Sequence, residues 1–111
     1  MNPETLASLA LPVIDGTWVV ALDCAGHAGG LAFLMVFDSQ ASGSRTSFGE
    51  ILVGGQHLLR RIQPHSGGLV RFAESVPNHL ALYGLRACAQ GLCTGSPGAQ
   101  LSNALDLVLG F

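Results

Sequence analysis

The chain has 111 residues, a length that fits one domain with one hydrophobic core. Hydrophobic residues make up 49% of the chain and charged residues 11%, a balance that excludes intrinsic disorder. The net charge of −2 and the absence of lysine argue against nucleic-acid binding, because phosphate groups attract a basic surface. The longest apolar run, Leu31–Phe37, is too short to form a transmembrane helix.

The first third of the chain predicts one short helix followed by two strands. Asn2 and Pro3 are typical of a helix start, so we expect a helix over residues 3–11. Thr17–Asp23 contains β-branched and aromatic residues in an alternating pattern, which predicts a strand. Leu31–Phe37 is apolar at every position, as expected of a central strand that is covered on both faces.

The middle of the chain predicts an amphipathic helix. Ser47 and Glu50 have the spacing of a capping box, and the apolar residues of the segment 48–62 fall on one helical face. Gly54–Gly55 weakens this prediction, since each glycine costs about 1 kcal/mol in a helix interior. The alternative is a hairpin in which Glu50–Val53 turns at the two glycines.

The last third predicts two strands and a helix. Gly68–Glu74 and His79–Ala87 read as an antiparallel hairpin, joined by a turn that contains proline and asparagine. Ser96 and Pro97 then repeat the pattern of a helix start. The following apolar residues form one helical stripe: Leu101, Ala104, Leu105, Val108 and Leu109.

This order of elements, α-β-β-α-β-β-α, predicts a single α+β domain over residues 1–111. Hairpins that are linked by a crossover helix should give an antiparallel or mixed sheet of about four or five strands, with helices packed on it.

Cysteine and histidine supply the only candidate metal site. The three cysteines are an odd number, so we expect free thiols in a reducing compartment. The four candidate zinc ligands lie in or beside glycine-containing turns: Cys24, His27, Cys88 and Cys93. Their spacing lacks paired CxxC motifs, and the competing interpretation makes the cysteines small apolar residues and His27 a solvated side chain.

A second candidate site is an apolar pocket between the sheet and a helix. Its predicted lining is aromatic: Trp18, Phe33, Phe72 and Tyr83. The same residues also suit an ordinary core. No spacing of nucleophile, base or paired carboxylates indicates a catalytic mechanism, so the catalytic residues are unassigned.

The sequence therefore favours a non-catalytic protein-interaction or assembly module, with no cofactor expected unless the zinc site exists. The low charged fraction leaves apolar surface exposed, which predicts a homodimer or a complex with another protein. The alternatives are a small enzyme or ligand-binding domain, and a zinc-stabilised domain. The start of the chain has Glu4 and no early basic residue, so we expect a cytoplasmic location.

Overall fold

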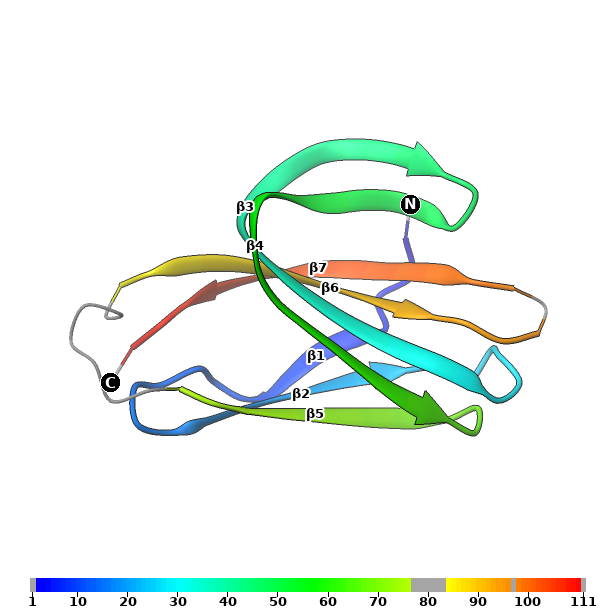
Figure 1. Cartoon of the computed structure of the whole chain (residues 1–111), viewed down its shortest axis with the longest axis horizontal. Helices are drawn as coiled ribbons and strands as arrows, with labels where there is room; N and C mark the ends of the chain where they lie inside the picture. The colour runs from blue at the N-terminus through cyan, green and yellow to red at the C-terminus, as the bar shows by residue number, and fades with distance from the viewer. Residues whose placement is uncertain (1, 77–83, 97, 111) are drawn as a thin grey trace.

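The computed structural model of the protein describes residues 2–76, 84–96 and 98–110. These residues form seven β-strands and no helix (Figure 1). The strands are β1 (Leu6–Ala10), β2 (Thr17–Asp23), β3 (Gly30–Thr46), β4 (Gly49–His65), β5 (Leu69–Ser75), β6 (Arg86–Cys93) and β7 (Gln100–Val108). The described part of the chain accordingly offers no helix that could span a membrane.

The strands form two antiparallel sheets. One sheet has three strands in the order β1-β2-β5, and the other has four in the order β4-β3-β6-β7. Buried side chains from both sheets meet in a single cluster, so the two sheets pack face to face as a sandwich.

The core follows from the alternation of side chains along the strands. The inner positions of β2 and β3 are buried, and their neighbours on β5 and β6 complete the layer: Trp18, Val20, Leu22, Ala32, Leu34, Val36, Phe72 and Ala89. Burial of each large apolar side chain contributes roughly 1.5–3 kcal/mol. The sheets approach closely at Gly91, where a Cβ atom would lie only 2.8 Å from Cδ1 of Leu22.

β3 and β4 form one long hairpin, each strand being 17 residues long. The hairpin bends at Asp38 and Gly55: Asp38 Oδ1 accepts the Gln56 N–H at 2.9 Å, and Gly55 has a φ of 76°. The strand register shifts on both sides of this bend, as it does at β-bulges. Beyond the bend, residues 38–56, here called the arm, curl back over β6 and β7 (Figure 1).

The predicted α+β fold is wrong, because the segments expected to be helices are strands. Residues 3–11 contain β1, which pairs with β2. The predicted C-terminal helix is β7, which pairs with β6. The predicted stripe is not one face of β7: its register shifts, so that Leu101 pairs with Leu92 on the outer face, while Leu105 pairs with Ala89 on the core side.

The predicted helix over residues 48–62 is β4, and its capping box does not form. The Thr46 hydroxyl accepts the Phe48 N–H at 3.0 Å and donates to the Gly49 carbonyl at 2.9 Å, which stabilises a hairpin turn. The alternative hairpin is also wrong, because its turn was placed at Gly54–Gly55. These two glycines lie within β4, at its bend, and not between two strands.

Three predicted strands are confirmed in position. Thr17–Asp23 is β2, Leu31–Phe37 lies in β3 between β4 and β6, and Gly68–Glu74 matches β5 within one residue. The predicted hairpin is wrong, because β5 and β6 belong to different sheets and β5 pairs with β2. Of the strand expected at His79–Ala87, residues 79–83 lie outside the described residues, and β6 continues to Cys93.

Candidate interaction surface

The outer face of the four-stranded sheet is the side that points away from the core. Ala32 and Leu34 are fully buried on the inner side of β3, so Leu31, Phe33 and Met35 project outward. The arm covers one half of this outer face, over β6 and β7. On the other half, here called the uncovered half, side chains of β3 and β4 such as Leu31 and Ile62 are exposed.

The covered half is organised by the side chain of Gln90, which is 0% exposed. Its Nε2 donates to the carbonyls of Glu50 at 2.8 Å and Ser102 at 2.9 Å, and its Oε1 accepts the Leu52 N–H at 3.0 Å. One amide thus joins β6, the arm and β7. A buried amide of this kind is stable only because all its hydrogen-bonding groups have partners.

Asn2 completes the same network from the N-terminal segment. Its Nδ2 donates to the Glu50 carbonyl at 2.7 Å and the Ser102 carbonyl at 2.9 Å, while its Oδ1 accepts the Glu50 N–H at 2.8 Å. The buried apolar contribution of the arm comes from Val53, which is 5% exposed. The arm is therefore held largely by directional hydrogen bonds.

The uncovered half is apolar. Phe33 pairs with Ile62 on one side and with Leu92 on the other, and Leu31 pairs with Pro64. Residues in such pairs share a face and touch. Together with Met35 they form the outer apolar patch: Leu31, Phe33, Met35, Ile62, Pro64 and Leu92. Leu31 and Ile62 are 44% and 49% exposed and Pro64 is also exposed, whereas Phe33, Met35 and Leu92 are partly buried.

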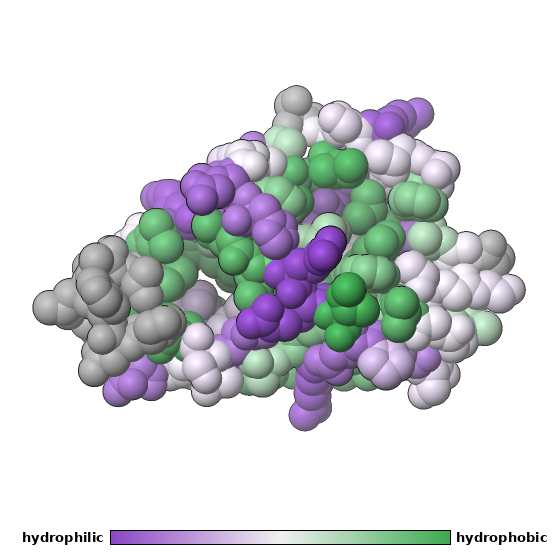
Figure 2. Space-filling model, viewed as in Figure 1, coloured by the Kyte–Doolittle hydropathy of each residue, from purple (hydrophilic) through white to green (hydrophobic). Residues whose placement is uncertain are grey.

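In the view of Figure 2, green hydrophobic areas lie on both sides of a diagonal band of purple hydrophilic side chains. Contiguous apolar surface with a polar rim marks an interaction site more often than single exposed apolar residues do.

Side chains close the strand edges beside this face. The amide of Asn103 accepts the Leu6 N–H at 2.9 Å and donates to the Leu6 carbonyl at 3.0 Å, so it occupies the edge of β1 as a neighbouring strand would. On β4, the Arg61 guanidinium donates to the Arg60 carbonyl at 3.1 Å and pairs with Glu74 at 2.6 Å. These side chains occupy main-chain groups at Leu6 and Arg60 and hinder pairing with another strand at those positions.

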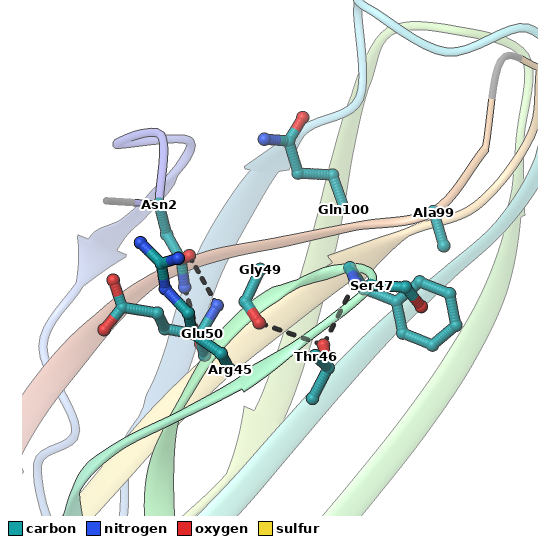
Figure 3. Close-up of a pocket in the computed structure, with 9 residues that line it drawn as sticks. Asn2, Arg45, Thr46, Ser47, Gly49, Glu50, Ala99 and Gln100 are labelled. Atoms are coloured by element: carbon teal, nitrogen blue, oxygen red, sulfur yellow. Dashed lines mark hydrogen bonds between the residues drawn. The ribbon is translucent and has the colours of Figure 1, made fainter.

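A polar notch of about 280 Å³ lies where the tip of the arm meets the N-terminal segment (Figure 3). Its lining includes Asn2, Arg45, Thr46, Glu50 and Gln100. Asn2 and Thr46 are already engaged in internal hydrogen bonds. These two side chains join the lining of the notch to the arm: Asn2 bonds to the main chain of Glu50, and Thr46 bonds to the main chain of Gly49.

The predicted aromatic pocket residues do not come together. Trp18 and Phe72 are core side chains, and Trp18 Nε1 donates to the Ser8 hydroxyl at 3.1 Å. Phe33 projects from the opposite face of its sheet, and Tyr83 lies outside the described residues. The helix expected to form the other wall of the pocket is absent from the described chain.

The predicted zinc ligands occupy three separate environments. Cys24 and Cys93 form a disulfide, with 5.6 Å between their Cα atoms, so the expectation of free thiols is wrong for this pair. The ring of His27 makes a 2.8 Å hydrogen bond to the Gly98 carbonyl. Cys88 is a free thiol on the outer face of β6. The described residues contain no group of three or more potential metal ligands.

Cys88 is the one cysteine with a perturbed pKa. Burial, followed by the charge of Asp106 and a hydrogen bond to it, raises the pKa of Cys88 to about 11. The thiol lines a cavity of about 330 Å³ beneath the bend of the arm. A thiol that stays protonated at neutral pH is a poor nucleophile, so the geometry does not favour cysteine catalysis.

Sequence reasoning missed the outer apolar patch. The segment Leu31–Phe37 could have indicated it, because its odd-numbered and even-numbered residues are all apolar. A strand of this kind has apolar side chains on both faces of the sheet, and both faces then need a cover. The residues contributed by β4 and β6 carried no such signal, because residues 48–62 predicted a helix and the strand expected at His79–Ala87 ended before Leu92. Comparison of the chain with protein-family models, curated proteins and solved structures found no match.

Proposed function

We propose that this chain is a non-catalytic protein-interaction module that forms a homodimer through the outer apolar patch. The observation that carries the proposal is the row Ile62–Phe33–Leu92, which crosses three strands on a sheet face that the arm leaves uncovered. Burying such a row between two copies removes apolar surface from water, which is the main driving force of association.

The closed strand edges support contact through the face. Asn103 occupies the main-chain groups of Leu6 on β1, and Arg61 occupies the carbonyl of Arg60 on β4, so these groups are not available to a second copy. The described acidic side chains lie outside the patch, so no buried carboxylate opposes the association of two copies.

Analytical ultracentrifugation of the wild-type protein and two matched variants tests the proposal. Ile62→Glu places a charge in the patch, and Leu69→Glu places one at a similarly exposed position, 59% exposed, on β5 in the other sheet. We expect a wild-type dimer at micromolar concentration, a monomeric Ile62→Glu variant and a dimeric Leu69→Glu variant. A wild-type protein that sediments as a monomer up to millimolar concentration would refute homodimerisation.

The compartment belongs to the same proposal. The sequence favoured the cytoplasm, but the Cys24–Cys93 disulfide supports an oxidising compartment, since structural disulfides are rare in the reducing cytosol. Cell lysis directly into a denaturant that contains a thiol-alkylating reagent and no reductant, followed by mass spectrometry, separates the two locations: an oxidising compartment gives one alkylated cysteine and a reducing one gives three. The cytoplasmic expectation stands if all three react.

A further inference from the structure

Arg60 is a charged side chain at the edge of the outer apolar patch. It pairs with Met35 across β3 and β4, so its side chain projects on the same face as Phe33 and Ile62. It is exposed, and its guanidinium has no ion-pair or hydrogen-bonding partner among the described residues. Its neighbour Arg61, by contrast, is paired with Glu74.

Arg60 belongs to a square of four residues made by two adjacent cross-strand pairs. Phe33 opposes Ile62, and two residues further along the strands Met35 opposes Arg60. One diagonal of the square joins the two aliphatic side chains, Ile62 and Met35. The other diagonal joins a cation, Arg60, to an aromatic ring, Phe33.

The chemistry of this square is self-complementary. A twofold axis that runs along the Ile62–Met35 diagonal exchanges the positions of Arg60 and Phe33 between two stacked copies. Each guanidinium then lies over the ring of the opposite copy, and Ile62 and Met35 each pack near their own symmetry mates. Such reciprocal contacts are the property that an isologous interface requires.

We infer that the occupant of the outer apolar patch is a second copy of this chain, stacked with Arg60 of each copy on Phe33 of the other. The inference rests on the proposed homodimer and names the contact that fixes its geometry. A guanidinium over an aromatic face is attractive, and it also keeps the two positive charges apart. Arginine and aromatic residues are enriched in such interfaces for this reason.

Two single variants that are mixed in solution provide the decisive experiment. Arg60→Ala keeps the ring and loses the cation, and Phe33→Leu keeps the cation and loses the ring. Each homodimer then lacks both reciprocal contacts and should dissociate about 30-fold more readily than the wild type. The mixed dimer keeps one contact, so it should bind about 5-fold more tightly than either mutant homodimer.

Native mass spectrometry of the mixture, with one variant isotopically labelled, measures this preference. An excess of mixed dimer over the statistical proportion supports the inference, because a contact within one copy would give no such excess. A statistical mixture, or variants that dimerise as tightly as the wild type, would overturn it. Arg71→Ala removes an exposed arginine from the outer face of the other sheet and serves as the control with unchanged affinity.

The failure of this inference is distinguishable from the failure of the proposed function. If the wild type dimerises, Ile62→Glu is monomeric and Arg60→Ala has no effect, the patch is the interface but the stacking is wrong. If the wild type is a monomer, both proposals fail.

Discussion

The two halves of the outer face of the four-stranded sheet have opposite chemistry. The covered half buries polar groups, above all Gln90 and Ser102, which are 0% and 1% exposed. The uncovered half leaves the apolar side chains Leu31 and Ile62 in solvent. Burial on this face therefore does not follow hydropathy alone, since the covered half buries Gln90 together with apolar side chains such as Val53 and Leu101. It follows the path of the arm, which goes where its main chain finds hydrogen-bonding partners.

The difference between the halves shows what each kind of surface needs from its cover. A buried amide such as Gln90 needs donors and acceptors at fixed positions, and the folded chain supplies them from the arm and from Asn2. Apolar surface has no directional requirement and can be covered by a separate molecule. The internal contact is thus polar and fixed, and the apolar face remains available for association.

The largest loss of stability should follow removal of the Cys24–Cys93 disulfide, which lies in the fold that supports both halves of the face. The Cys24–Cys93 disulfide joins β2 to the end of β6 and closes a loop with a sequence separation of 69 residues. Its loss in Cys93→Ser should destabilise the fold by about 4 kcal/mol, since the unfolded chain regains the entropy of a long loop. Chemical denaturation with and without a dithiol reductant measures this. The variant should be insensitive to the reductant, and a wild type equally insensitive would contradict the prediction.

The covered half should respond next most strongly. Gln90→Leu keeps the side-chain volume but leaves the Leu52 N–H without its partner, which should cost about 2 kcal/mol. Because Asn2 donates to the same two carbonyls, combining Gln90→Leu with Asn2→Ala should cost more than the sum of the single changes. A double-mutant cycle of unfolding free energies measures the coupling. Strict additivity would mean that the two amides act independently.

The burial of Cys88 near the bend of the arm can be tested by the pH dependence of the unfolding free energy. Its pKa of about 11 in the folded protein lies above the value of about 8.5 for an unfolded cysteine, so the native state retains the proton longer. The associated stability is complete below about pH 8.5 and is lost as the pH rises through about 11. Denaturation across this range, compared with Cys88→Ala, should show the loss only in the wild type. Rapid alkylation of the native protein at pH 8 would argue against the buried thiol.

The smallest change in stability should follow substitution in the outer apolar patch. Ile62→Gln alters an exposed side chain, so the unfolding free energy of the dilute protein should change by no more than about 0.5 kcal/mol. The same substitution should weaken self-association, which Gln90→Leu should not do in the fraction that remains folded. A large loss of stability in dilute Ile62→Gln would mean that the patch belongs to the fold and not to an interface.

Local sequence pattern was enough to predict the strands in which that pattern and the packing agree. Thr17–Asp23 has β-branched and aromatic residues in alternation, and every residue of Leu31–Phe37 is apolar. Each segment therefore predicts a strand from its own residues, without reference to its neighbours in the fold. The central position of the second strand was also readable, because a segment that is apolar on both sides needs two covers.

The remaining elements and the candidate site depend on contacts between segments that are distant in the sequence. β1, β4 and β7 carry apolar spacings that suit a helix as well as a strand, and their hydrogen bonds run to residues far away in the sequence. Asn103 reaches Leu6, and Cys93 reaches Cys24, across most of the chain. The patch depends on the same pairings, since Ile62, Phe33 and Leu92 become neighbours only when three strands align. Local propensity contributes tenths of a kcal/mol per residue, whereas these distant contacts contribute whole kcal/mol each, so the distant contacts determined the fold.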